Sequence, residues 1–175
     1  MISRLITEER KKQLETFKYP DDILTYLDKM QEEHHYTDEE MEKDLGVALW
    51  KAYALNNSGS YSAFALSEKI LKKVENEGFD TGVWCSRYSY ALMCLRKFDE
   101  SLTYIIHGTT VAPDYPWGWL QLARLYYKLN MIDHTLEAIS KGLTLVPGDP
   151  DFLAFKDDVK NRRDFETVMS RYIDG

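Results

Sequence analysis

Residues 82–113 read GVWCSRYSYALMCLRKFDESLTYIIHGTTVAP, and residues 116–147 read PWGWLQLARLYYKLNMIDHTLEAISKGLTLVP, which is a related sequence one constant interval further along the chain. Seven residues are identical between the two stretches when Gly82 is aligned with Pro116: Leu95 and Leu129, Asp99 and Asp133, Leu102 and Leu136, Ile105 and Ile139, Gly108 and Gly142, Thr110 and Thr144, and Pro113 and Pro147. A fixed period of this kind indicates repeats of one supersecondary unit that stack on each other.

The second stretch shows what one unit consists of. Its apolar residues recur at spacings of three and four, the period of a helix face, in two sets: Trp119, Leu122, Tyr126 and Leu129, followed by Leu136, Ile139 and Leu143. Residues 130–133 supply a turn between the sets, and Pro147 ends the second helix because proline cannot continue a helix interior. Ala123 and Thr135 are small, which suits two helices that approach closely. Each unit is therefore predicted to be a helix, a short turn and a second helix.

This pattern resembles the tetratricopeptide repeat (TPR) family, in which W-x2-L-G-x2-Y, A-x3-F and a proline recur in each unit and the unit has the same length as the interval found above. The matching residues of the second unit are Trp119, Leu122, Ala123, Tyr126, Thr135, Ile139 and Pro147. Those of the first unit are Cys85, Tyr88, Ser89, Leu92, Ser101, Ile105 and Pro113. The departures are Ala or Ser for the family Gly, Ile for Phe, and Trp84 one residue out of register. The resemblance implies an all-α fold, an α-solenoid of stacked antiparallel helix pairs.

The rest of the chain is predicted to extend the array at both ends. Residues 37–79 form a divergent repeat: a capping box of Thr37 and Glu40 starts a helix that runs to the loop at residues 56–59, and residues 61–74 supply its partner. Residues 1–36 are an acidic extension packed on the array, with one helix over residues 5–17 and another that begins at Pro20. Residues 80–113 and 114–147 are the two TPR-like repeats, and residues 148–175 form a single C-terminal capping helix.

Composition restricts the class of protein. Hydrophobic residues make up 44% of the chain and charged residues 29%, which is typical of a globular protein, and the net charge of −7 counts against binding to nucleic acid. The first twelve residues lack the apolar region of a secretory signal, and the longest apolar run, residues 90–95, is too short to cross a membrane. We therefore expect a cytoplasmic protein that makes no membrane contact.

Cys85 and Cys94 fall on opposite faces of one helix, so we expect two free thiols.

Motifs that would indicate an enzyme are missing. The sequence contains no G-x-G-x-x-G, no phosphate-binding loop and no G-x-S-x-G nucleophile elbow. Glu32 and His35 form one Glu-x-x-His element, but a di-iron bundle needs two, and His107 and His134 are not preceded by Glu at that spacing. We therefore expect no catalytic residues, no metal and no cofactor.

The TPR resemblance implies that the first helix of each pair lines a concave groove. By the family register, the groove-facing residues are Val83, Ser86, Tyr90, Met93, Trp117, Leu120, Arg124 and Tyr127. This set is mainly apolar and aromatic with one Arg, so we expect no carboxylate clamp of the Lys, Asn and Arg type, and favour a peptide with apolar anchors. The alternative is structural: Val83 and Leu120 would pack between repeats, Trp117 would belong to a loop, and Tyr90, Arg124 and Tyr127 would be ordinary surface residues.

The leading hypothesis is thus a non-catalytic protein–protein interaction module, a scaffold or adaptor, that binds a protein or peptide partner in this groove. The second hypothesis is a partner-neutralising or regulatory protein that acts through its acidic N-terminal surface. Residues 1–47 carry 7 basic and 13 acidic side chains, so the run from Glu32 to Asp44 is either a docking surface for a basic partner or a solvated helix end. An all-helical enzyme is the least favoured reading. Self-association is left open, because an uncapped terminal repeat exposes an apolar face.

Overall fold

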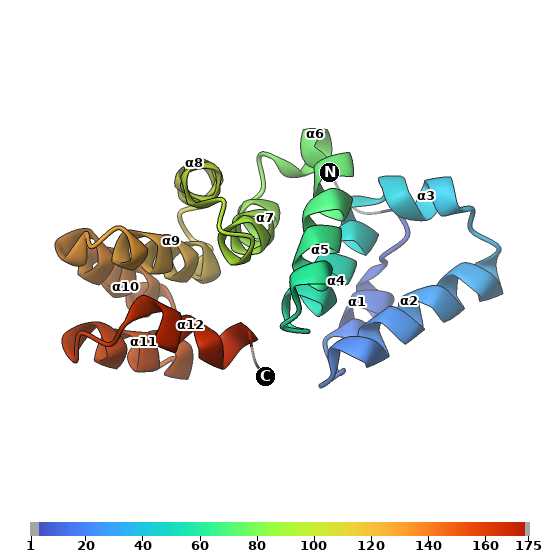
Figure 1. The fold of residues 1–175 in the computed structure, drawn as a ribbon. Helices are drawn as coiled ribbons and strands as arrows, with labels where there is room; N and C mark the ends of the chain where they lie inside the picture. The colour runs from blue at the N-terminus through green and yellow to red at the C-terminus, as the bar shows by residue number, and fades with distance from the viewer. Residues whose placement is uncertain (1–3, 174–175) are drawn as a thin grey trace.

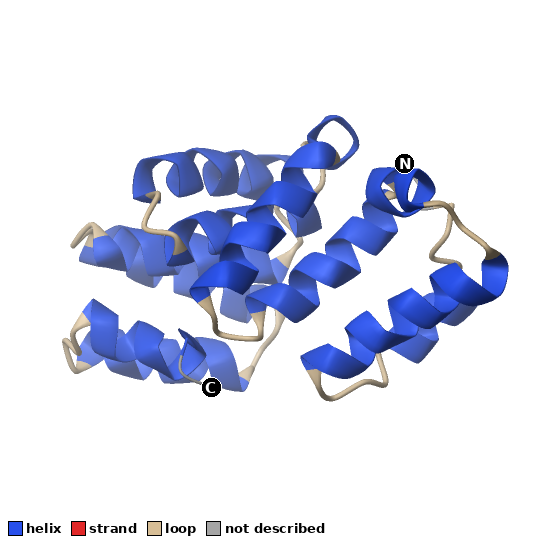
Figure 2. Ribbon diagram, turned by 45° about the vertical axis from the view of Figure 1, so that its right-hand side comes forward, coloured by secondary structure: helices blue, strands red, loops and turns tan. Residues whose placement is uncertain are grey.

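The computed structural model describes residues 4–173, which form twelve helices and, within that range, no strand (Figure 2). In chain order they are α1 (Glu8–Leu14), α2 (Pro20–His34), α3 (Asp38–Lys43), α4 (Leu45–Asn56), α5 (Tyr61–Lys73), α6 (Glu75–Gly78), α7 (Gly82–Cys94), α8 (Phe98–Val111), α9 (Pro116–Lys128), α10 (Ile132–Leu145), α11 (Pro150–Lys160) and α12 (Phe165–Ile173). The predicted all-α class is confirmed.

Three antiparallel pairs make up the body of the array: α4 with α5, α7 with α8, and α9 with α10 (Figure 1). The pairs follow one another in space in chain order, since α5 packs on α7 and α8 packs on α9. The first helices are also neighbours, because α7 contacts both α4 and α9. This is the α-solenoid of stacked helix pairs that the sequence period predicts. At the N-terminal end, α2 packs on α4.

The two helices of each central pair come together at small residues, as expected. In the first pair Ser89 and Ser101 are fully buried, and each hydroxyl donates to the other residue's backbone carbonyl, over 2.9 and 2.7 Å. In the second pair the equivalent residues, Ala123 and Thr135, are also fully buried. A larger side chain at these positions would force the helices apart.

The turns inside the pairs repeat as well. Arg96 (φ 62°) and Asn130 (φ 59°) both adopt the left-handed conformation just after α7 and α9. The next N–H in each case, that of Lys97 or Met131, donates 2.9 Å to a carbonyl five residues back, which closes the helix end.

A third turn of this kind corrects the prediction of one capping helix over residues 148–175. Arg162 (φ 50°) ends α11, and the Arg163 N–H donates 3.0 Å to the carbonyl of Asp158. Asp164 then starts a second helix, because its carboxylate accepts the N–H of Thr167 at 3.1 Å. The end of the array is therefore a hairpin of α11 and α12. Residues 174 and 175 of the predicted helix lie outside the described residues, as do residues 1–3 of the predicted extension.

The divergent repeat differs from its prediction in one respect. Thr37 and Glu40 form the expected capping box, but the helix they start stops at Lys43. Asp44 interrupts it by capping α4: its carboxylate accepts the N–H of Val47 at 2.9 Å and, in addition, two N–H groups of residues 4 and 5 at 2.8 and 3.0 Å. One predicted helix is therefore two, α3 and α4, and the break is where the N-terminal segment attaches.

The hydrophobic core lies between successive helices. Trp84, out of register with the family pattern, is fully buried: it stacks on Tyr88 with ring centroids 4.7 Å apart, and its indole N–H donates 3.0 Å to the carbonyl of Leu71. Cys85 and Cys94 are free thiols, as predicted, and burial raises the pKa of each to about 12. Within residues 4–173, none of the helices combines the length and the apolar character that a membrane span requires.

Candidate binding groove

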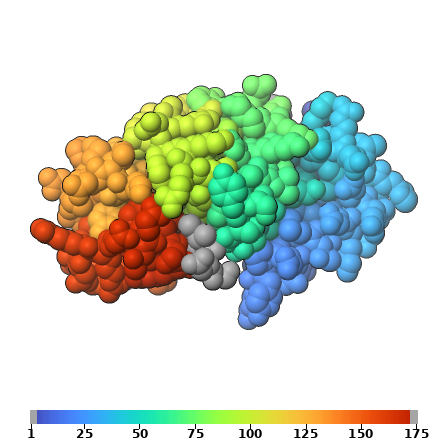
Figure 3. Space-filling view, viewed as in Figure 1, coloured from blue at the N-terminus to red at the C-terminus, as the bar shows by residue number. Residues whose placement is uncertain are grey.

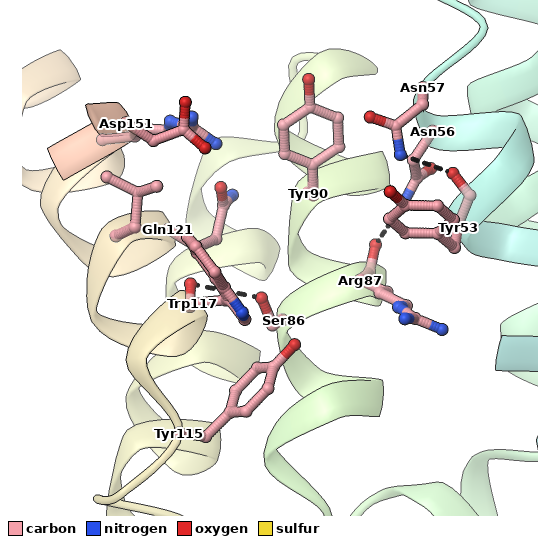
Figure 4. Close-up of a pocket in the computed structure, with 12 residues that line it drawn as sticks. Tyr53, Asn56, Asn57, Ser86, Arg87, Tyr90, Tyr115, Trp117, Gln121 and Asp151 are labelled. Carbon is pink, nitrogen blue, oxygen red and sulfur yellow. Dashed lines mark hydrogen bonds between the residues drawn. The ribbon is translucent and has the colours of Figure 1, made fainter. Parts of the chain in front are cut away.

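The first helices of successive units surround an open hollow of about 410 Å³ (Figure 4). Its walls come from the C-terminal end of α4, the middle of α7, the first half of α9 and the first turn of α11. Figure 4 shows aromatic, amide and guanidinium side chains that reach the hollow from both sides. This is the face that the TPR resemblance assigns to a concave groove.

Many of the lining residues occupy equivalent positions in successive repeats. Positions that line the hollow on one helix recur on the next in four sets: Tyr53, Arg87 and Gln121; Asn56, Tyr90 and Arg124; Ser86 and Leu120; Trp117 and Asp151. The period thus extends backward into α4 and forward into α11, beyond the two repeats that the sequence comparison covered. Each first helix presents the same positions to one common surface.

Five of the eight sequence-predicted groove residues line the hollow: Ser86, Tyr90, Trp117, Leu120 and Arg124. Trp117 belongs to the first turn of α9 and not to a loop, and its side chain is 37% exposed while stacked against Phe152, with ring centroids 6.1 Å apart. Leu120 is only 4% exposed and packs with α11 side chains, so it contributes mainly to the floor.

The other three predicted residues lie elsewhere. Val83 is half-buried on α7 and does not line the hollow. Met93 is 2% exposed and packs in the core beside Met169 of α12. Tyr127 packs edge-on against Phe155 of α11, and its hydroxyl donates 2.5 Å to the carbonyl of Arg163. Met93 is covered because α12 folds back over this part of the face, and Tyr127 is partly covered by α11 and by the turn that leads into α12. The sequence predicts α11 and α12 as one helix, so this cover has no counterpart in the prediction.

Sequence reasoning also missed several lining residues: Tyr53, Asn56, Asn57, Arg87, Tyr115, Gln121 and Asp151. A signal for two of them is present in the sequence. Asn56 stands one full period before Tyr90, and Asp151 stands one full period after Trp117, so the same displacement extended by one unit in each direction assigns both to the groove. Tyr53, Arg87 and Gln121 share one repeat position that the family register does not place in the groove.

Arg87 brings positive charge to the hollow and fastens α7 to α4. Its guanidinium group donates 2.6 Å to the carbonyl of Leu49 and lies over the rings of Trp50 and Tyr53, at 5.7 and 5.1 Å from their centroids. Burial lowers the pKa of this guanidinium group, and the nearby phenol groups of Tyr115 and Tyr53 act against that change. Arginine remains charged at neutral pH, and it favours such stacked positions over lysine.

Asn56 and Gln121 present amide oxygens that have no hydrogen-bond partner within the described chain. Their side chains are 6% and 2% exposed. The amide nitrogens fix the orientation: Asn56 Nδ2 donates 3.0 Å to the carbonyl of Arg87, and Gln121 Nε2 lies 3.5 Å from both Ser89 Oγ and Met93 Sδ. A buried acceptor without a partner costs about 1–3 kcal/mol, so an N–H donor from a ligand would recover free energy at either atom.

The second guanidinium group of the hollow is that of Arg124, which is 8% exposed. It lies 5.8 Å from the ring centroid of Tyr90. Tyr90 in turn packs edge-on against Phe64 of α5, with ring centroids 6.2 Å apart. Arg87 and Arg124 together give the hollow two cations, against the single carboxylate of Asp151 among its lining residues.

The acidic N-terminal run is largely occupied with local structure. Five of its carboxylates have partners inside the chain, through caps, hydrogen bonds or ion pairs: Asp38 with Gln31, Glu39 with Lys43, Glu40 with Thr37, Glu42 with Lys73, and Asp44 with Val47. His34 stacks on Tyr36, and His35 caps α2 in the left-handed conformation. Over residues 4–173, no three His, Cys, Asp or Glu side chains group as metal ligands would.

The comparisons with known proteins bear on the fold. No family model and no curated protein matches the chain. In structure the chain is similar to the Arabidopsis OM64 TPR domain, with a TM-score of 0.54 and 8% identity over 66% of this chain and 98% of that one. It is also similar to a chain of the APC/C hetero-tetramer Cut9-Hcn1, with a TM-score of 0.62 and 18% identity over 86% of this chain and 27% of that one.

A third similar structure is the CopN-Scc3 complex, with a TM-score of 0.50 and 13% identity over 85% of this chain and 89% of the matched chain. At these identities the likeness concerns the fold alone. The fold is a TPR-like array of helical repeats.

Proposed function

We propose that this chain is a protein–protein interaction module that binds a segment of a partner protein in the hollow between α4, α7, α9 and α11. The observation that carries the proposal is the pair of buried amide oxygens, on Asn56 and Gln121, at the wall of a hollow whose lining recurs with the repeat. Fixed acceptors without partners suit a ligand that brings its own N–H donors, and an extended peptide backbone is such a ligand.

The side chains around the amides favour a peptide with an aromatic or aliphatic anchor. Trp117, Tyr53 and Tyr90 offer ring surface, and rings are frequent hot spots in protein interfaces. The excess of guanidinium groups over carboxylates favours an acidic residue beside that anchor. The polar groups are mainly amides, phenols and guanidinium groups, which hold a ligand but do not make up a nucleophile with its base, so the proposed function is binding and not catalysis.

The proposal is tested with peptides selected from a random library displayed on phage against the full chain. We expect selected peptides to lose ~2 kcal/mol or more of binding free energy on Trp117→Ala or Arg124→Ala, measured by titration calorimetry. Leu129→Ala is the matched control, since Leu129 is 42% exposed and does not line the hollow. Equal affinity for all three variants, each with an unchanged circular dichroism spectrum, would remove the hollow as the binding site.

The acidic N-terminal surface remains a hypothesis without a specific observation in its favour. It would gain support if binding weakened steeply with salt and if Glu33→Gln reduced affinity while Trp117→Ala did not. Glu33 suits this comparison because it is exposed at the end of α2.

A further inference from the structure

The concave face has a second part, which α12 covers. α12 folds back alongside α11 (Figure 1). Its Glu166 meets Arg96, which lies in the turn between α7 and α8, seventy positions earlier in the chain. In the space-filling view the red segment of α12 abuts the yellow-green segment that begins α8 (Figure 3). We call the surface under α12 the seat, defined by Met93, Arg96, Phe98, Leu125 and Lys128.

Ionic contacts join one side of α12 to the seat. The two carboxylate oxygens of Glu166 accept hydrogen bonds from both Arg96 guanidinium nitrogens, at 3.1 and 2.9 Å, and from Lys128 Nζ at 2.8 Å. Lys128 Nζ also lies over the rings of Phe98 and Phe165, at 5.0 and 4.9 Å from their centroids. One acidic residue of the helix therefore meets a basic rim contributed by two repeats.

Apolar contacts hold the middle of α12. Met169 is 2% exposed and packs with Met93 and Leu125, while Val168 is fully buried beside Phe155 of α11. Phe165 meets Phe98 edge-on, with ring centroids 6.4 Å apart. These three residues of α12 form one apolar stripe at helical spacing.

The far end of α12 is held by a buried carboxylate. Asp158 of α11 is 1% exposed and accepts hydrogen bonds from both guanidinium nitrogens of Arg171, at 2.9 and 3.1 Å, as well as from Arg163 at 2.5 Å. The seat and the α11 surface beside it therefore match a full helical pattern: aromatic at 165, acidic at 166, aliphatic at 168 and 169, basic at 171.

Side-chain contacts, more than backbone packing, hold α12 in place. It has nine residues, which is below the length at which an isolated helix is stable in water, and its backbone makes few close approaches to the other helices. Its ionic contacts to the seat are solvent-exposed, since Arg96 and Glu166 are 66% and 46% accessible, and exposed ion pairs contribute little. It follows a residue, Arg162, in the strained left-handed conformation.

We propose that the seat is a second docking surface, for an amphipathic helix of a partner protein that carries the α12 pattern, and that α12 is the internal occupant which such a helix displaces. The seat contains none of the residues that line the hollow, so this inference stands apart from the proposed peptide site. The chain's own helix defines the chemistry of the partner: a ring and two aliphatic side chains on one face, with an acid next to the ring and a base at the other end.

The test uses a fluorescent peptide of residues 161–173 and the full chain. In the double variant Phe165→Ala with Met169→Ala, the internal helix loses its anchors while every residue of the seat is kept. We expect the peptide to bind this variant about tenfold or more tighter than the unsubstituted chain, because the seat is open for a larger fraction of the time. The matched control is Leu145→Ala with Leu153→Ala, two truncations at exposed positions, for which no gain is expected.

A charge exchange then locates the binding. Adding Arg96→Glu to the double variant is expected to reduce peptide affinity about tenfold, and a peptide with Glu166→Lys is expected to regain it. No gain in the double variant, or no response to Arg96→Glu, overturns the proposal. Loss of the native circular dichroism spectrum in the double variant also overturns it, because α12 would then be an integral part of the fold. Hydrogen exchange that rises over residues 165–173 but not over α7 and α9 supports it.

Discussion

The hollow and the seat share two helices, α7 and α9, yet they differ in chemistry and in accessibility. Tyr90 and Met93 are three residues apart on α7: Tyr90 lines the hollow, whereas Met93 is buried under α12. The hollow is polar and aromatic with fixed amide oxygens, and the seat is apolar with a basic rim. The repeat therefore determines which positions face inward, and the non-repeating C-terminal helix determines which of them stay open.

The largest effect on stability is expected where α11 packs against α9 and α12. Phe155 is fully buried in contact with Tyr127 and in the cluster of Val168. Phe155→Ala is expected to lower the free energy of unfolding by about 3–5 kcal/mol, through lost burial and the cavity that remains. Urea denaturation measures this, and Leu153→Ala, at a 48% exposed position of the same helix, is expected to stay within about 0.5 kcal/mol of the parent. If both variants lost the same free energy of unfolding, the buried and the exposed face of α11 would contribute equally to stability, and this prediction would be wrong.

A substitution in the hollow is expected to raise the free energy of unfolding instead of lowering it. Gln121→Met keeps the volume of the side chain and removes the buried amide oxygen that has no partner, so the free energy of unfolding is expected to rise by about 1 kcal/mol. The same variant is expected to bind selected peptides more weakly, because the acceptor is gone. Asn57→Met changes an exposed amide of the same hollow and is expected to bring no gain in stability. A destabilised Gln121→Met variant would show that this amide serves the fold and not a ligand.

The sequence predicts some parts of the fold and not others. The four helices of residues 82–147 follow from spacing alone, since Leu122, Ile139 and their equivalents repeat a local period. The attachment of residues 4 and 5 to Asp44 does not follow, because their N–H groups lie about forty residues away in the chain, whereas the capping of α4 by Asp44 is a local contact with Val47. The turn at Arg162 has no local signal either. Glycine or asparagine in a sequence indicates a possible left-handed residue, as at Asn130, whereas arginine does not.

The same limit applies to the groove residues. Ser86, Tyr90 and Arg124, which the family register places on the groove face, line the hollow, because register alone fixes the direction of a helical side chain. Met93 and Tyr127 have the same register, but α12 covers Met93, and α11 with the turn before α12 partly covers Tyr127, through contacts between distant parts of the chain. Such contacts carry no local pattern. Accessibility thus lies beyond what periodicity can predict.

Acid should loosen the attachment of α12 to the seat. Hydrogen bonds from Lys128 and Arg96 lower the pKa of the Glu166 carboxyl group below its ordinary value. The stabilising effect is therefore complete above the unfolded-state pKa of roughly 4.3 and is lost as the pH falls through the lower folded-state value. We expect hydrogen exchange of residues 165–173 to accelerate over this interval. In a Glu166→Gln variant the exchange of these residues is expected to be faster at neutral pH and to change less with acid; an unchanged profile would place the pH response elsewhere.

The smallest effect concerns the turn that leads into α12. Arg162 has φ 50°, a conformation that glycine adopts without strain, whereas Arg162→Ala keeps the strain. Arg162→Gly is expected to raise the free energy of unfolding by about 0.5 kcal/mol, since relief of about 1–2 kcal/mol of left-handed strain is offset in part by the greater freedom of glycine in the unfolded chain. Because a relaxed turn favours the docked helix, the same variant should bind the peptide of residues 161–173 more weakly than the parent does. Stabilisation without weaker peptide binding would mean that the turn and the occupancy of the seat are independent.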